Sequence, residues 1–128
     1  MEFDLSINSS DLTILRKQLE EAPMLFWYYS NQLEDYKRKS VNLKLRLDVL
    51  EATIASSIRR NSQGEKVSEV KINRLLYEVP EYIALLEQHH QSIEDVGKAD
   101  AIVKALYQRH SIMITLSSLV RQEMRQLI

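Results

Sequence analysis

Apolar residues recur at alternating steps of three and four along two long stretches, and this spacing constrains the fold more than any other feature of the chain. The first stretch covers residues 24–57 and the second covers residues 82–127. A three-four step keeps side chains on one stripe of an α-helix and is typical of coiled-coil packing. We therefore predict two long helices with one apolar stripe each. The stripe residues are Phe26, Tyr29, Leu33, Tyr36, Ser40, Leu43, Leu47, Leu50, Ile54 and Ser57, then Tyr82, Leu86, His89, Ile93, Val96, Asp100, Val103, Leu106, His110, Met113, Ser117, Val120, Met124 and Leu127.

Composition supports a helical protein with a single domain. The 128 residues include only two glycines and two prolines, which is too few turn residues for many short strands. Apolar residues make up 45% and charged residues 27%, as in folded soluble domains. Cysteine is absent, which excludes a disulfide framework and thiolate chemistry. We expect one all-α domain over residues 1–128.

Cap and turn residues predict where the helices begin and end. A first, short helix ends where Pro23 interrupts it, and Ser68 can cap a short connecting helix that Pro80 ends. The expected elements are a short helix over 9–22, a long helix over 24–60, a loop over 61–67, a short helix over 68–79 and a long helix over 80–127. The two long helices should fold back as an antiparallel hairpin. Gly97 costs the last helix about 1 kcal/mol relative to alanine, so a bend or break near it stays open.

A second apolar stripe lies on the face of the first long helix that is opposite to its seam. One hairpin cannot bury both sides of a helix, and exposed apolar surface is costly in water. We therefore expect copies of the chain to self-associate. The alternative is that the short helix over 9–22 covers this second stripe. The second stripe consists of Val41, Leu45, Val49 and Ala52, and Ile112, Leu116 and Leu119 widen the apolar face of the last helix.

The aromatic run LFWYYS, residues 25–30, places Trp27 and Tyr28 off the seam. Exposed aromatic rings beside cations can stack nucleic-acid bases, and they can equally anchor a subunit interface. The interface is the favoured interpretation. The predicted interface residues are Trp27, Tyr28, Val41, Leu45, Val49, Ile112, Leu116 and Leu119.

The residues suggest no catalytic, metal or cofactor site. His89 and His90 are adjacent, so neither has the i, i+4 partner of a helical zinc pair. A satisfied core histidine is the better interpretation of His89 and His110. We therefore expect a protein that is not an enzyme and uses no cofactor or metal. The first residues are acidic where a signal peptide needs cations, and no apolar run approaches the ~20 residues that span a bilayer, so we expect a cytoplasmic protein that does not bind membranes.

The basic middle of the chain is the strongest functional signal. The net charge is only −1, yet residues 37–74 carry ten cations against four acids. Such residues often pair with acids across a coiled coil, but these cations outnumber the nearby acids. Binding of nucleic-acid phosphates and binding of an acidic protein both stay open. The candidate nucleic-acid-binding residues are Lys37, Arg38, Lys39, Lys44, Arg46, Arg59, Arg60, Lys66, Lys71 and Arg74.

Several segments resemble the phage recombination-mediator proteins of the UvsY type. The stretch KSVNLKLRLD, residues 39–48, is similar to the segment of that family that is centred on Lys-x-Arg. The later order is also similar. It consists of a basic turn, then KVSEVKI, VPEY and a long helix that contains ALYQRHSIMITL. The resemblance covers most of the chain from residue 24 onward.

The resemblance implies a small, all-helical protein that is not an enzyme, assembles into a ring-like oligomer and binds single-stranded DNA. It also implies a role in loading a RecA-like recombinase onto strands covered by a single-strand-binding protein, in phage-infected cells. Lys44 and Arg46 would match the DNA-contacting Lys and Arg of the family. The family has paired tyrosines and a loop soon after that Arg, whereas the helix continues here, so Arg59 and Arg60 are the alternative pair. A coiled-coil adaptor that binds an acidic protein is the alternative function.

Overall fold

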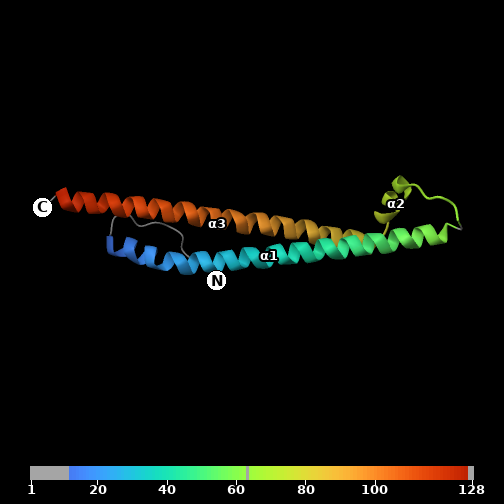
Figure 1. Cartoon of the computed structure of the whole chain (residues 1–128), viewed down its shortest axis with the longest axis horizontal. Helices are drawn as coiled ribbons and strands as arrows, with labels where there is room; N and C mark the ends of the chain where they lie inside the picture. Colours follow the sequence, from blue (N-terminus) through green and yellow to red (C-terminus); the bar gives the residue numbers. More distant parts are fainter. Residues whose placement is uncertain (1–11, 63, 127–128) are drawn as a thin grey trace. The chain divides into compact units, whose positions relative to one another are not determined.

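The computed structural model describes residues 12–62 and 64–126, and in this part of the chain it is all-α (Figure 1). Helix α1 spans Leu12–Asn61, the short helix α2 spans Glu69–Leu76, and α3 spans Pro80–Gln126. The long helices α1 and α3 pack antiparallel as a hairpin, and α2 lies in the connection between them. The predicted all-α hairpin with a short connecting helix is confirmed.

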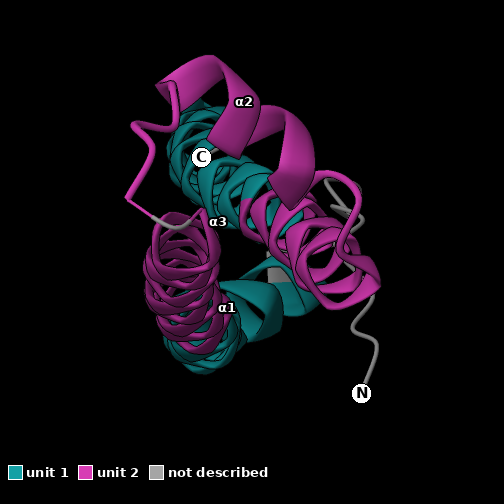
Figure 2. Ribbon diagram, turned by 90° about the vertical axis from the view of Figure 1, so that its right-hand side faces the viewer, with its two compact units in different colours: residues 1–34, 97–128 teal, residues 35–96 magenta. Residues whose placement is uncertain are grey.

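The chain divides into two compact units, coloured separately in Figure 2. Unit 1 comprises residues 1–34 and 97–128, and unit 2 comprises residues 35–96. Within unit 1, the start of α1 and the end of α3 bury apolar side chains that include Leu15 and Met113, both 0% exposed. The rings of Phe26 and Tyr107 meet edge to face, with centroids 4.8 Å apart. This geometry is favourable for aromatic pairs, so α1 and α3 are held together by an apolar stripe with an aromatic edge.

Unit 2 has a three-helix core. Leu47 of α1, Ile72 and Leu76 of α2, and Tyr82 of α3 form one buried cluster. An isolated eight-residue helix is too short to be stable in water, so α2 depends on this packing. Partly buried side chains surround the cluster, namely Leu50, Ile54, Ala55, Ile58, Val67, Val79, Ile83, Leu85 and Leu86.

The separate short helix expected over 9–22 is not observed. Helix α1 continues through Pro23, and residues 9–11 lie outside the described residues. A proline inside a helix costs about 3 kcal/mol because its ring nitrogen cannot donate the backbone hydrogen bond. Burial of Leu15 and Leu25 on either side of the proline contributes about 1.5–3 kcal/mol each, which offsets that cost. Tertiary packing therefore outweighs the local helix-breaking signal.

The other predicted helix ends lie close to the observed ones. The predicted end of the first long helix is residue 60, and α1 ends at Asn61. The short helix predicted over 68–79 is shorter in the structure and spans Glu69–Leu76. Helix α3 passes through Gly97 without a break, and residue 127 lies outside the described part. Because helix propensity is a weak preference, one glycine does not interrupt a helix of this length.

The buried stripe of α3 differs from the predicted one. Ser92, Ala99 and Arg109 are buried, whereas their predicted neighbours Ile93 and His110 are exposed. The distance between packed helices depends on the side chains at the contact, and serine and alanine allow a close approach. The Ser92 hydroxyl donates a hydrogen bond to the carbonyl oxygen of His89, which satisfies a polar group at this position. The buried stripe of α3 therefore includes the small residues Ser92 and Ala99, whereas the apolar spacing predicts Ile93 in the stripe.

The two glycines should respond to alanine substitution in opposite directions. A Cβ at Gly97 would meet no atom within 4 Å and would lie in a helix, so Gly97→Ala should raise the free energy of unfolding by about 1 kcal/mol. Gly64 has a φ of +83°, which residues with a side chain rarely adopt. Gly64→Ala should therefore lower the free energy of unfolding by about 1 kcal/mol. Thermal unfolding followed by circular dichroism measures both changes. Equal shifts in the same direction would contradict the expectation.

Truncation of Ile72 should detach α2 from the core of unit 2. Ile72 is buried in the cluster with Leu47, Leu76 and Tyr82, so Ile72→Ala should lower the free energy of unfolding by about 2–5 kcal/mol. Urea unfolding measures this loss, and hydrogen exchange should show faster exchange over Glu69–Leu76. Val70→Ala is the matched control, because Val70 belongs to the same helix and is 80% exposed. A similar loss in both variants would contradict the packing role.

Candidate nucleic-acid interface

All ten candidate cations belong to unit 2, and all ten are exposed. Helix α1 carries seven of them, the loop before α2 carries Lys66, and α2 carries Lys71 and Arg74. The short helix therefore adds its cations to the same unit as those of α1. Exposure agrees with the sequence-based interpretation of a charged surface, while the choice of partner stays a prediction.

Ion pairs separate three of these cations from six others. Arg38 pairs with Asp35 at 3.5 Å, Lys44 with Asp48 at 3.1 Å and Arg59 with Glu69 at 2.9 Å. These side chains are exposed, and exposed ion pairs contribute little to stability, so a polyanion can compete with the carboxylates. Six cations form no ion pair with any described residue. They are Lys39, Arg46, Arg60, Lys66, Lys71 and Arg74.

The helix geometry separates the two residues that the family resemblance selected. Residues two positions apart on an α-helix point about 160° apart, so Lys44 and Arg46 lie on different flanks of α1. Lys39, Arg46 and Arg60 are spaced by seven and fourteen residues and share one flank. A strand that follows α1 along one side would therefore meet these three cations, whereas it would meet Lys44 only from the other side.

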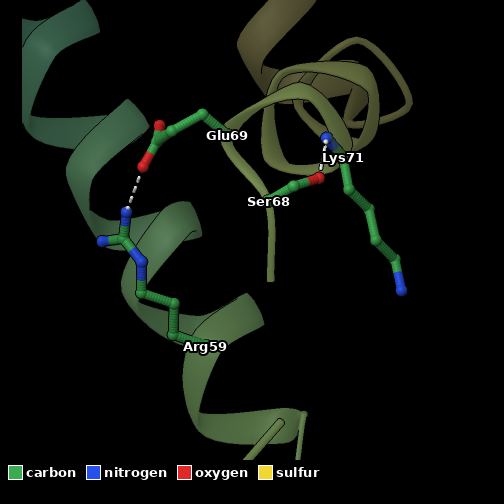
Figure 3. A network of polar contacts seen from close by, with 4 residues as sticks. All are labelled: Arg59, Ser68, Glu69 and Lys71. Carbon is green, nitrogen blue, oxygen red and sulfur yellow. Dashed lines mark hydrogen bonds and ion pairs between the residues drawn. The ribbon is translucent and has the colours of Figure 1, made fainter. Parts of the chain in front are cut away.

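Local contacts position the cations at the α1–α2 connection, as Figure 3 shows. The Arg59 guanidinium donates a hydrogen bond to Oε1 of Glu69, which links the end of α1 to the first turn of α2. The hydroxyl of Ser68 accepts a hydrogen bond from the backbone N–H of Lys71 at 3.2 Å, which caps α2. The side chain of Lys71 points away from the Arg59–Glu69 pair. Its ammonium group is therefore free to face a ligand.

Acidic residues share unit 2 with these cations. The segment 75–96, which includes the first part of α3, carries five acids and no lysine or arginine. Counted over residues 35–96, ten acids match the ten cations. A polyanion that binds this unit would therefore be attracted to α1, the loop and α2 rather than to the first part of α3. The predicted excess of cations in residues 37–74 is present, but the net charge of unit 2 as a whole is zero. The hairpin topology could have indicated this, because it brings the acidic start of the second long helix into the same unit.

The pKa of Tyr82 is raised by its position in the core of unit 2. Burial raises the pKa of Tyr82 above its ordinary value of 10.0, and the carboxylate of Glu51 and the phenol of Tyr77 raise the pKa further. The ammonium group of Lys44 opposes this change. The rings of Tyr77 and Tyr82 meet edge to face at 5.8 Å. The tyrosinate form is therefore disfavoured in the folded chain.

The predicted interface residues are mostly exposed. Trp27 is 68% exposed, and Val41, Leu45, Val49, Ile112 and Leu119 are exposed as well, whereas Tyr28 and Leu116 are half-buried. Residues 12–22 continue helix α1, and Val41, Leu45 and Val49 are exposed, so the separate short helix that is the alternative cover for this stripe is not observed among the described residues. Trp27 and Tyr28 belong to unit 1, whereas the candidate cations belong to unit 2. The choice between a subunit interface and base stacking at these two residues stays a prediction.

The histidines do not assemble a metal site. The rings of His89 and His90 are 6.3 Å apart and tilted, and His110 is exposed. Within residues 12–62 and 64–126, no three histidine, aspartate or glutamate side chains lie close enough to hold a metal ion. In the same part of the chain, no helix has an apolar stretch long enough to cross a bilayer.

Comparison of the chain with protein-family models, with curated proteins and with solved structures finds no match. The resemblance to the UvsY-type mediators therefore stays a prediction that depends on the residues alone.

Ionisation of Tyr82 should lower stability at alkaline pH. Its pKa is raised in the folded state, so the unfolded chain loses this proton first as the pH rises through about 10. The stability that depends on the protonated phenol is present below pH 10 and is lost as the pH rises through the raised pKa. Urea unfolding between pH 9 and 11.5 should show a steeper loss in the wild type than in Tyr82→Phe. Equal slopes in the two proteins would contradict this expectation.

Proposed function

We propose that this chain binds single-stranded DNA through the exposed cations of unit 2 and acts as a recombination mediator. The observation that carries the proposal is the set of ten exposed cations in one unit, six of which form no ion pair with a described residue. The mediator role, with a RecA-like recombinase and a single-strand-binding protein as partners, is supported by the family resemblance of residues 39–48 and the later segments. No catalytic step is part of this function.

Phosphate binding fits unpaired, exposed cations because counterions are released when Lys and Arg neutralise a nucleic-acid backbone. If one copy neutralises four phosphates, the logarithm of affinity should fall with the logarithm of salt concentration at a slope of about −3. Phosphate contacts carry no base information, so sequence preference should be weak. Several copies on one strand would raise the affinity through avidity.

Docking of an acidic protein is the second candidate function. The observation that favours it is the exposed apolar stripe of Val41, Leu45 and Val49, which runs along α1 among the same cations. Such a surface fits an amphipathic acidic helix. In that case charge reversal abolishes partner capture, while the chain binds no oligonucleotide at any salt concentration.

Charge reversal should locate the DNA-binding residues. Lys39→Glu with Arg60→Glu on α1, and Lys71→Glu with Arg74→Glu on α2, should each weaken binding by at least about tenfold, because each pair removes two phosphate contacts and adds repulsion. Fluorescence anisotropy of a labelled single-stranded oligonucleotide in low and high salt measures the affinity. The control Lys98→Glu with Arg121→Glu makes the same net charge change in unit 1 and should have a smaller effect.

Two results would contradict the proposal. No detectable binding by the wild-type protein in low salt would remove DNA as the ligand. An equal loss of affinity in the control would show that only net charge matters and that unit 2 holds no site. Circular dichroism should show the same helix content in all three variants, because every substituted side chain is exposed.

A further inference from the structure

A groove lies between α1 and α3 in unit 2. Its volume is about 630 Å³, and no residue of α2 lines it. The apolar side chains along it belong to Leu45, Val49 and Leu50 of α1 and to Ala84 and Leu85 of α3. The remaining lining residues are Arg46, Thr53, Glu81 and Gln88. The groove is thus an apolar channel with one cation and one anion in its walls.

Two exposed apolar side chains form a ridge beside the groove. Leu45 and Val49 are 57% and 66% exposed, although both are large apolar side chains that line the groove. Residues four positions apart lie one above the other on a helix, so these two form a ridge along α1 beside the channel. A ridge that lies beside a groove can enter the groove of a second copy, and the second ridge can then enter the first groove.

The two charges lie at opposite ends of the groove. The α1 wall runs from Leu45 to Thr53 and the α3 wall from Glu81 to Gln88. Because the helices are antiparallel, Glu81 lies at the end near Thr53, whereas Arg46 lies seven residues away along α1. Seven residues correspond to about 10 Å, which agrees with the absence of a described ion pair between Arg46 and Glu81.

We propose that two copies of this chain dock groove to groove about a two-fold axis that passes close to Val49. A two-fold axis at the middle of the groove places Arg46 of each copy opposite Glu81 of the other, because it exchanges the two ends. The ridge of each copy enters the groove of the other, and two hairpins form a four-helix arrangement. Charge complementarity and the exposed ridge together identify a second copy as the occupant.

This contact does not depend on the proposed function. It engages Arg46 in a pair with Glu81 of the other copy, so five of the six cations without an ion pair to a described residue stay available to a phosphate backbone. Lys39 and Arg60 lie beyond the two ends of the α1 wall, so they stay accessible to a phosphate backbone. The dimer can therefore be tested in the absence of DNA, and loss of DNA binding alone leaves it intact.

A charge swap tests the dimer. Arg46→Glu and Glu81→Arg should each weaken self-association by at least about tenfold, because each places like charges opposite one another. The double variant, Arg46→Glu with Glu81→Arg, should restore the wild-type association constant to within about threefold, because the charges are exchanged and the pair re-forms. Sedimentation equilibrium at several protein concentrations measures the constants. Circular dichroism checks the fold of each variant.

A second pair of variants tests the ridge without changing Arg46 or Glu81. Val49→Glu should abolish self-association, whereas Val70→Glu, at an 80% exposed position on α2 outside the groove, should leave it unchanged. A monomeric wild-type protein overturns the proposal. So does an oligomer that resists Val49→Glu, or a double charge variant that associates as weakly as the single ones.

Discussion

Burial of the leucine stripe of α1 against α3 is the interaction on which the other features depend. Leu33, Leu43 and Leu47 are buried, and the same stripe continues into the cluster that holds α2. A helix can direct only one side toward its partner in a hairpin. Packing of this stripe therefore leaves Val41, Leu45 and Val49 on the surface of the same helix. The exposed ridge is a direct consequence of the hairpin.

The short helix α2 depends on its neighbours for its stability. Eight residues do not form a stable helix in water, yet Ile72 and Leu76 are buried against α1 and α3. The Ser68 cap and the Arg59–Glu69 pair then define how α2 begins and which side faces α1. Its cations, Lys71 and Arg74, are placed in the same unit as the cations of α1 by apolar packing rather than by charge.

The lysines and arginines of unit 2 all lie before α3 in the chain, and none of the described ion pairs of this unit joins α1 to α3. The ion pairs of α1 that involve Arg38 and Lys44 lie within the helix itself, at spacings of three and four residues. Such pairs form as soon as the helix forms and need no tertiary contact. The first part of α3 contributes acids to unit 2 without neutralising Lys39, Arg46 or Arg60 through any described ion pair. Unit 2 is therefore neutral in sum and strongly charged on individual faces.

The sequence by itself determined the helical class, the leucine stripe of α1 and the exposure of the ten cations, because these follow from side-chain spacing along one helix. Only the tertiary structure decided that α1 continues through Pro23, since burial of Leu15 and Leu25 on both sides offsets the lost hydrogen bond. It also decided that Ser92 and Ala99 face the core in place of Ile93. The positions of Arg46 and Glu81 at opposite ends of one groove depend on how two distant helices align, and spacing within a single helix carries no information about that alignment.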